Sequence, residues 1–553
     1  MSLIVTVLDT TGIQPYIFGS NRLRENVGAS YLVSQATDEW VKKVLEDLKK
    51  NQNWKIQIPN QPEDEPRIED GELTAELVYA GGGNTVLLFQ TIDYAKEFTR
   101  KLSRKILEEA PGINLVAAHK EFEWDSNSDP LYQVIQNVMK NEVDRAKQQR
   151  VPSAPLLGLG VTADCRSSRL VAVGISNEEQ YKMPSGHQAY PISREIGAKL
   201  VAVNDANKQL KHFIFDPKKP HKKDDYEIPL DVDDMGRSEG ESSYIAIVHA
   251  DGNNMGKRFQ EVGIDKSNRE YIIEIRKLSH SIQEAGKNAL KKVYETVVKS
   301  LDSGSLAEKI TLKDNTLPFR PIVYGGDDVT FICDGRLGLE LAAIYLQAFE
   351  DQPVSYGGKL TACAGVCIVK SHYPFARAYE LSEDLCKSAK KYAKSKAKYQ
   401  KDFTGQELDF SALDWHLAAS GLIGSVNDIR EREYQGAKGK LYMRPVLLAQ
   451  DAEWRTWQGI KKVIQELNNG ERWKDKRNKV IALREILRKG AKATKEYLAA
   501  YNLGDLPLFS ENSIQLSKNG WADDSGKRIC GYFDAIEAME FYVSLTEDKN
   551  EQV

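Results

Sequence analysis

Apolar runs that stop abruptly at glycines or carboxylates are the clearest pattern along this chain. Residues 322–331 contain two short apolar runs that are joined by Gly325, Gly326, Asp327 and Asp328. The runs predict two buried antiparallel strands, and the two glycines supply the positive backbone angles that a tight hairpin needs. Both aspartates would then be held at the tip of a rigid hairpin.

A second apolar run, at residues 244–250, also ends at a carboxylate, Asp251. A long amphipathic helix is predicted after it, because apolar residues recur at steps of three and four positions. These residues are Ile275, Leu278, Ile282, Ala289, Val293 and Val297. Residues 360–370 predict another buried strand, and a helix with a stripe of apolar residues follows it. A strand with an acidic end, a helix and an acidic hairpin, in this order, are typical of the palm domain of nucleotidyl cyclases and polymerases.

The chemistry expected at these strand ends depends on the paired acids. Carboxylates fixed side by side repel each other unless a cation lies between them, so the arrangement suits magnesium or manganese bound to substrate phosphates. We expect Asp251, Asp327 and Asp328 to be catalytic, and the same side chains with the backbone carbonyl of Gly252 to bind the metal. The alternative is an ordinary Gly-Gly-Asp turn whose acids face water. The second acidic strand end favours the catalytic interpretation.

The expected nucleotide-binding positions lie at the same strand ends. They are Gly252, Asn253 and Asn254 after the first strand, and Gly325 and Gly326 in the hairpin. Many palm enzymes have a second carboxylate where this chain has Asn253, which is a weaker and neutral ligand, so the number of metal ions stays open. His249 lies on the same strand face as Asp251, but a packed strand histidine is the simpler interpretation.

The first 90 residues repeat this plan. Residues 3–8 form an apolar run that ends at Asp9, residues 31–48 have a helical pattern, and residues 79–89 form a second glycine-rich hairpin. The same order of strand, acidic end, helix and hairpin therefore predicts a second palm domain in the chain.

The hairpin of this first copy has lost its acids. Gly83 and Asn84 take the places of Asp327 and Asp328, so the copy lacks the carboxylates that would hold two metal ions. We predict a non-catalytic palm in which Gly82 and Gly83 let the backbone approach a nucleotide. A purely structural hairpin is the alternative.

The predicted fold class is α+β, with two ferredoxin-like palm domains of the nucleotidyl-cyclase type. The expected domains are a first palm at residues 1–150, a small inter-palm domain with linker at 151–240, a second palm at 241–402 and a helical C-terminal domain at 403–553. The linker segments are 216–225 and 236–243, which are rich in charge, Pro, Gly and Ser. The C-terminal helices are expected to include residues 415–422, 454–467 and 477–503.

Composition agrees with several packed domains in one chain of 553 residues, of which 41% are hydrophobic and 28% charged. The net charge of −4 gives no overall attraction to nucleic acid. Six cysteines include no closely spaced Cys-x-x-Cys pair, so we expect no structural zinc. Free thiols, no signal sequence and no long apolar stretch predict a cytoplasmic protein that does not enter a membrane.

These motifs resemble the large polymerase/cyclase subunit of type III CRISPR effector complexes. The resemblance includes residues 318–328, residues 364–375, the Ala389-Lys390 step, and the N-terminal segments 9–18 and 24–32. It implies that Lys390 contacts the triphosphate of the substrate, although a lysine run on a helix is ordinarily a solvated face. Many members of the family begin with a nuclease domain that has a His-Asp motif, whereas no histidine here is followed by aspartate. We therefore expect no DNase activity of this chain.

The resemblance also implies an activity and partners. The expected reaction converts ATP to cyclic oligoadenylate messengers with release of pyrophosphate, in antiviral defence. The expected partners are other subunits of an RNA-guided complex with its guide and target RNA. Two alternatives stay open: a catalytically silent, nucleotide-binding and RNA-sensing scaffold subunit, and a stand-alone synthase of a cyclic dinucleotide.

Overall fold

A computed structural model describes most of the chain. The described residues are 1–63, 65–81, 83–125, 130–150, 158–214, 226–235, 243–306, 309–405, 408–418, 424–436, 439–449, 453–524 and 526–545. They form two compact units. The first consists of Met1–Asp224, Asn254–Lys287 and Pro353–Gly358, and the second consists of Asp225–Asn253, Asn288–Gln352 and Lys359–Val553. Gly82 and almost all of the two expected linker segments lie outside the described residues.

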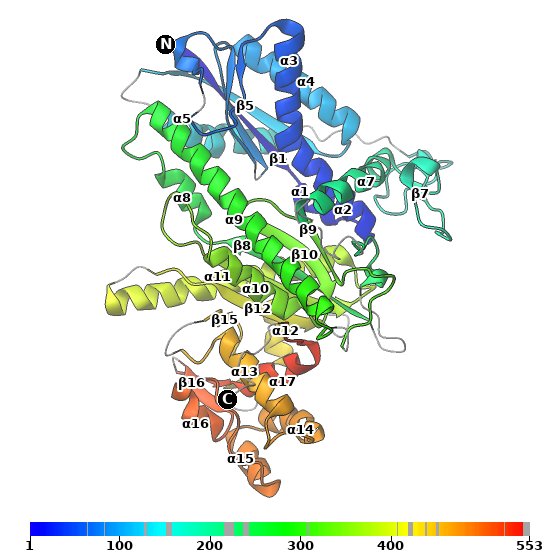
Figure 1. The fold of residues 1–553 in the computed structure, drawn as a ribbon, viewed down its shortest axis with the longest axis vertical. Coiled ribbons are helices and arrows are strands. Elements are labelled where there is room, and N and C mark those ends of the chain that lie inside the picture. The colour runs from blue at the N-terminus through cyan, green and yellow to red at the C-terminus, as the bar shows by residue number, and fades with distance from the viewer. Residues whose placement is uncertain are drawn as a thin grey trace. The chain divides into compact units, whose positions relative to one another are not determined.

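The first unit contains a sheet in the order β2-β3-β4-β1-β5. Its strands are β1 (Ser2–Thr11), β2 (Ile56–Gln57), β3 (Ala75–Gly81), β4 (Asn84–Phe89) and β5 (Asn114–Glu123). Its main helices are α1 (Ile13–Phe18), α2 (Leu23–Ser34), α3 (Trp40–Gln52), α4 (Ile92–Glu109), α5 (Leu131–Asn137) and α6 (Asp144–Gln149). Strands β1, β3, β4 and β5 with their intervening helices give the βαββαβ order of a ferredoxin-like fold. The predicted first palm therefore has the expected fold, with α3 and α4 beside each other and α4 packed on the sheet (Figure 1).

The expected inter-palm region packs mainly through one long helix, α7 (Arg194–Ile214), which lies against α2. Two short strands, β6 (Gly174–Ile175) and β7 (Pro191–Ile192), pair antiparallel before it. Glu25 in α2 is fully buried and accepts hydrogen bonds from Tyr190 at 2.8 Å and Ser167 at 3.0 Å. These polar contacts attach the region to the first palm within the first unit.

The second unit is built on a sheet in the order β15-β12-β11-β8-β10-β9. Its strands are β8 (Tyr244–Gly252), β9 (Phe319–Val323), β10 (Asp328–Asp334), β11 (Ala362–Lys370), β12 (Ala412–Ala418) and β15 (Val446–Leu447). Strands β11-β8-β10-β9 have the same ferredoxin-like order as β5-β1-β4-β3 of the first unit. Helices α10 (Gly338–Glu350) and α11 (Phe375–Thr404) pack on this sheet. The internal repeat predicted from the sequence is therefore present in the two sheets.

The long helix predicted after the first acidic strand end is also present. It consists of a short helix α8 (Met255–Glu261) and a long helix α9 (Asn268–Asp302). The apolar positions that predicted the helix, such as Leu278 and Val293, are buried.

The expectation of a helix at residues 415–422 is wrong for residues 415–418, and residues 419–422 lie outside the described residues. Residues 412–418 form β12, which pairs in parallel with β11 and so extends the palm sheet beyond residue 402. The sequence Leu413, Asp414, Trp415, His416, Leu417 alternates, which is the period of a strand. This alternation is the signal that the sequence analysis missed. The polar positions Asp414 and His416 are nevertheless buried, at 0% and 1% exposure.

The rest of the C-terminal region is helical, as expected, but it also has a small sheet. Its helices are α12 (Val426–Glu433), α13 (Trp457–Asn469), α14 (Arg477–Arg488), α15 (Ala491–Ala500), α16 (Ile514–Ser517) and α17 (Tyr532–Ala538). The sheet has the order β13-β14-β17-β16, with β13 (Gln435–Gly436), β14 (Gly439–Lys440), β16 (Trp521–Asp524) and β17 (Lys527–Cys530). Among the described helices of the whole chain, none is long and apolar enough to span a bilayer.

Candidate active site

The glycine-rich hairpin has the backbone conformation that its sequence predicts. Gly325 and Gly326 have φ angles of 121° and 95°, which residues other than glycine rarely adopt. Asp328 then begins β10 and stands directly opposite Asp251 on β8. The backbone N–H of Gly252 donates to the carbonyl of Asp327 at 3.1 Å, so the two strand ends are joined beside the acids.

Asn253 is placed by hydrogen bonds that point into the protein. Its side-chain nitrogen donates to the Thr361 hydroxyl and to the Phe410 carbonyl, both at 3.1 Å, and the residue is 7% exposed. Both amide hydrogens are therefore used, and only the side-chain oxygen of Asn253 is left for a nucleotide or metal. Asn254, the next residue, has φ 57° and begins α8. Its part in nucleotide binding stays a prediction.

Lys390 reaches the end of β8 from helix α11. Its ammonium lies 2.7 Å from the Asp251 carboxylate and donates to the Gly252 carbonyl at 2.9 Å. This reach depends on close packing of α11 on β11, because a Cβ at Gly365 would overlap the backbone of Ser382 and Cys386. The glycine lets the helix backbone lie directly on the strand. Lys390 is thus brought to the two oxygens that the sequence predicts as metal ligands.

The acids of the site repel one another. Burial, with the neighbouring carboxylates of Asp251 and Asp328, raises the pKa of Asp327 to about 6. Burial and Asp251 raise the pKa of Asp328 to about 7, while the positive charge of Lys390 opposes this shift. The Asp328 side chain is 51% exposed, so water screens part of the repulsion. Raised carboxylate pKa values in a cluster of this kind are typical of functional sites.

His249 is a packed histidine of strand β8, which was the simpler interpretation of the sequence. It is 5% exposed, and its Nδ1 lies 3.1 Å from the Thr330 hydroxyl and 3.4 Å from Asp328. Its ring meets Tyr379 edge to face. Burial lowers the pKa of His249, so the ring is neutral near pH 7 and positions its neighbours by packing.

The donor set at these strand ends fits a hard divalent cation. Among the described residues, no group of three or more His, Cys, Asp or Glu side chains is already arranged as a metal site. Carboxylate and carbonyl oxygens are nevertheless the ligands that Mg²⁺ and Mn²⁺ prefer. The Lys390 ammonium bonds two of these oxygens, on Asp251 and Gly252, and so supplies a positive charge where the metal is expected. A metal ion would compete with Lys390 for them.

The first palm has a matching but neutralised strand end. Asn84 on β4 stands opposite Asp9 on β1, as Asp328 stands opposite Asp251. With its amide turned so that the nitrogen faces the acid, Asn84 donates to both Asp9 oxygens at 3.1 and 3.2 Å. Lys147 also forms an ion pair with Asp9. The single carboxylate is thus satisfied by groups of the protein itself, which supports the prediction of a non-catalytic first palm.

Gly83 of this hairpin has φ 85°, and its carbonyl accepts a hydrogen bond from the backbone N–H of Thr10 at 3.3 Å. Its predicted contact with a nucleotide is untested, and Gly82 is not among the described residues.

Lys147 is a residue that the sequence reasoning missed. It comes from the last helix of the first palm, as Lys390 comes from the last helix of the second palm. The signal that could have found it is the repeat itself, since a basic helix follows the fourth strand in both copies.

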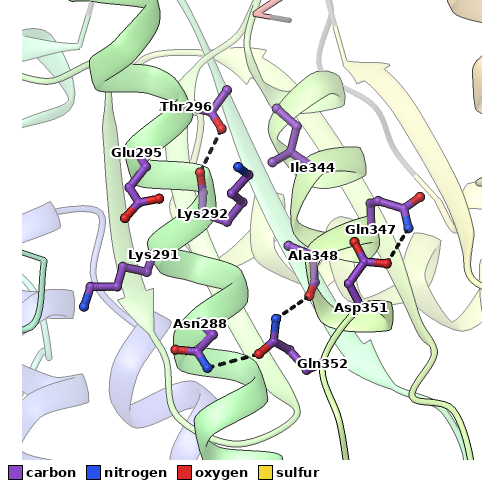
Figure 2. A pocket seen from close by; sticks show the side chains of 10 residues that line it. All are labelled: Asn288, Lys291, Lys292, Glu295, Thr296, Ile344, Gln347, Ala348, Asp351 and Gln352. Carbon is purple, nitrogen blue, oxygen red and sulfur yellow. Dashed lines mark hydrogen bonds between the residues drawn. The ribbon is translucent and has the colours of Figure 1, made fainter.

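A pocket of about 470 Å³ lies between α9 and α10 and is separate in its lining from the acidic site. Figure 2 shows Asn288 of α9 donating to Gln352, which in turn donates to the carbonyl of Ala348 in α10. Its polar side chains are largely bonded to one another, so the groove is a solvated seam between two helices.

The ferredoxin-like order and the acids at facing strand ends define a palm domain. Residues 244–399 match the family model of the second palm domain of Cas10/Cmr2, so this part of the chain is similar to that domain. No curated protein matches the chain.

Solved structures confirm the fold. The crystal structure of Csm1 in T. onnurineus has a TM-score of 0.51 and 14% identity, and the match covers 98% of this chain and 70% of that one. The Csm1-Csm4 cassette in complex with pppApApA has a TM-score of 0.50 and 13% identity, with 98% and 69% coverage. The apo Csm1-Csm4 cassette has a TM-score of 0.40 and 14% identity, with 70% of this chain and 53% of that chain covered. This chain thus spans between 53% and 70% of the length of these relatives.

Proposed function

We propose that the second palm joins molecules of ATP into short oligoadenylates, cyclic in their final form, and releases pyrophosphate at each step. The observation that carries this proposal is the cluster of Asp251, Asp327 and Asp328 at facing strand ends, with Lys390 bonded to Asp251. Nucleotidyl transfer is catalysed mainly by positioning and electrostatic stabilisation, and it needs anionic groups for metal ions and a cation for phosphates. The chain provides both at one strand end.

In the proposed reaction the 3′-hydroxyl oxygen of one nucleotide forms a bond to the α-phosphorus of another. The bond from that phosphorus to the β-phosphate oxygen breaks, and pyrophosphate leaves with the electron pair. Asp328, half exposed and with a pKa of about 7, is the proposed acceptor of the hydroxyl proton. A metal ion held by Asp251, Asp327 and the Gly252 carbonyl would lower the pKa of the hydroxyl and stabilise the transferring phosphate. Lys390 would exchange its contact with Asp251 for the triphosphate.

Adenine as the base and the antiviral role rest on the resemblance to the type III CRISPR large subunit. One structure of similar fold is a Csm1-Csm4 cassette in complex with pppApApA, a triphosphorylated triadenylate. Another contains pppApA. Such linear molecules have the composition of intermediates in the proposed synthesis. By the same argument we propose that this chain works with a second protein subunit and with guide and target RNA.

The test measures pyrophosphate release and product mass from each of the four nucleoside triphosphates. The full chain is assayed alone and with its partner subunits and target RNA, in magnesium or manganese. Asp327→Asn/Asp328→Asn removes two negative charges from the site, and Glu471→Gln/Asp475→Asn removes two from exposed positions elsewhere in the second unit. We expect the wild type and the control variant to convert ATP to oligoadenylates, and Asp327→Asn/Asp328→Asn to form no product. Nucleotide binding without product in every condition would instead favour the scaffold function, and a dinucleotide product would favour the stand-alone synthase.

A further inference from the structure

A second cavity of the second unit is lined by basic side chains. It has a volume of about 340 Å³, which lies within the usual range of small-ligand pockets. Its lining includes Arg430, Lys440, Arg444, Arg455 and Lys527, together with Tyr442. No carboxylate is present among the described residues that line it. Neither the acidic site nor the proposed reaction uses any of these residues.

Short, well-fixed elements of the C-terminal region carry the five cations. Arg430 is in α12, whose first turn is capped by the Ser425 hydroxyl. Lys440 in β14 pairs with Ile529 in β17, and Lys527 lies two residues before Ile529. Because strand side chains alternate, Lys527 and Ile529 point to the same face of the small sheet. The cavity therefore has two lysines on adjacent strands facing arginines from a helix and a loop.

Arg444 is fully buried at the cavity, yet part of its guanidinium has no partner. Its Nη1 bonds Glu537 at 2.9 Å and lies 3.3 Å from Asp534. Its Nε and Nη2 make no hydrogen bond within the described structure, although the side chain is 0% exposed. A buried N–H without an acceptor is costly. Neither atom has accessible surface, so this guanidinium acts on the cavity through its charge and not through a hydrogen bond to a ligand.

Arg430 has the same arrangement. Its two terminal nitrogens bond the buried Asp414 carboxylate at 3.0 and 2.5 Å, while its Nε has no partner among the described residues. Its guanidinium lies 5.0 Å from the centre of the Tyr442 ring, and the Lys440 ammonium lies 5.4 Å from it. Each buried arginine is thus held by carboxylates, and its remaining N–H groups are enclosed by the protein.

The charges of Arg430 and Arg444 also act on a buried histidine. His416 is 1% exposed, and its pKa is lowered to about 3 by burial and by the charges of Arg444 and Arg430. Arginine forks match the geometry of phosphate oxygens, and such charge-assisted hydrogen bonds are stronger than neutral ones. A phosphate group brings several acceptor oxygens and negative charge, whereas a water molecule would bring no charge.

We propose that this cavity binds the phosphate groups of a small phosphorylated compound, through the ammonium groups of Lys440 and Lys527, with the charges of Arg430 and Arg444 behind them. The site is distinct from the acidic strand ends of the palm, although Ser388 of α11 is part of its lining, and it does not depend on catalysis there. Tyr442 would contact the non-phosphate part of the ligand with its ring.

The test is calorimetric binding of pyrophosphate and of ATP to the full chain, in EDTA and about 150 mM salt, so that metal-dependent binding at the palm does not contribute. Lys440→Gln/Lys527→Gln removes two charges at the cavity. Lys462→Gln/Lys474→Gln removes two charges from exposed positions of the same unit and is the matched control. We expect one molecule to bind, a loss of affinity of at least tenfold in the cavity variant, and less than twofold in the control. Urea unfolding checks that both variants are folded, and Lys527→Gln alone, at an exposed position, repeats the test if the double variant is not.

Equal binding by the wild type and both variants, or no binding of either compound, would overturn the proposal. A short single-stranded RNA is titrated in parallel to separate the two sources of phosphate. If only the RNA binds, and the cavity variant weakens it, the site takes a nucleic-acid backbone and the small-ligand proposal is wrong. Because EDTA abolishes the proposed palm reaction, these outcomes are independent of whether the palm is active.

Discussion

Asp251 and Asp328 stand directly opposite each other on neighbouring strands β8 and β10, as Asp9 and Asn84 do on β1 and β4. The register is the same in both palms, and one side chain differs. In the second palm two acids face each other, and burial together with Asp251 raises the pKa of Asp328. In the first palm an amide faces the acid and binds it.

Replacing the hairpin acids should abolish turnover but leave the fold intact. We expect Asp327→Asn/Asp328→Asn to lower the rate of pyrophosphate release at least about 10²-fold, which is the usual cost of removing one electrostatic stabiliser of a transition state. Circular dichroism should show no change, since asparagine keeps the shape of each side chain. A rate within a factor of two of the wild type would refute a catalytic part for these acids.

Lys390 should affect metal binding and turnover in opposite directions. Its ammonium bonds Asp251 and the Gly252 carbonyl, so Lys390→Met frees both oxygens for a cation. We expect Mn²⁺ to bind the nucleotide-free variant more tightly, measured by electron paramagnetic resonance, while turnover of ATP falls and KM rises. Lys387→Met is the control, because Lys387 pairs with Glu383 on the same helix and is 64% exposed. Weaker Mn²⁺ binding in Lys390→Met would contradict the competition.

The raised pKa values predict a pH dependence of stability without metal. The ordinary pKa of an aspartate is 3.8, and the pKa values of Asp327 and Asp328 in the folded chain are about 6 and about 7. At a pH between these values the folded chain retains protons on both acids that it loses on unfolding. Their contribution is therefore present at pH 4 and lost as the pH rises through 6 to 7. Between pH 4 and pH 8 we expect the free energy of unfolding of the wild type to fall by about 1–3 kcal/mol more than that of Asp327→Asn/Asp328→Asn. This range allows for the exposure of Asp328.

Urea unfolding of both proteins at pH 4 to 8 measures this difference, and the comparison cancels the titration of all other groups. Magnesium should remove most of the loss at pH 8 by neutralising the acids. A constant difference between the two proteins across the pH range would mean that the acids do not repel one another.

Gly365 should be essential for the position of α11. A Cβ there would overlap the backbone of Ser382 and Cys386, so Gly365→Ala forces the helix away from β11. We expect a loss of about 1–3 kcal/mol in unfolding free energy, as for overpacked cores, together with lower turnover because Lys390 moves from Asp251. Gly160→Ala is the control, since a Cβ at Gly160 meets no atom within 4 Å. Equal midpoints in urea for the two variants would show that the packing is not tight.

Adding an acid to the first palm should destabilise it. Asn84→Asp replaces the amide that binds Asp9 with a second carboxylate, which Lys147 alone must balance. We expect a lower midpoint of thermal unfolding at pH 8, and a smaller effect at pH 4, where a carboxylate is partly protonated. Asn84→Ser, which adds no charge, separates repulsion from the loss of the amide. If both substitutions have the same effect at both pH values, repulsion is not the cause.

Local patterns were enough to find most of the second palm. The strand ends at Asp251 and Asp327, the hairpin glycines and the long helix were all predicted, because periodicity and positive φ angles are properties of neighbouring residues. Strand β12 was missed although residues 413–417 alternate between apolar and polar. Its parallel pairing with β11, and the burial of Asp414 and His416, depend on tertiary packing.

The sequence by itself determined that the chain contains two copies of one palm plan and that only the second keeps its acids. The tertiary structure decided which basic side chains form ion pairs with the acids of each palm. Lys390 meets Asp251 from 139 positions away, Lys147 meets Asp9 from 138 positions away, and Arg444 meets Asp534 from 90 positions away. A local pattern reports which residues share a face, whereas an ion pair or a basic cavity forms only where separate elements pack together.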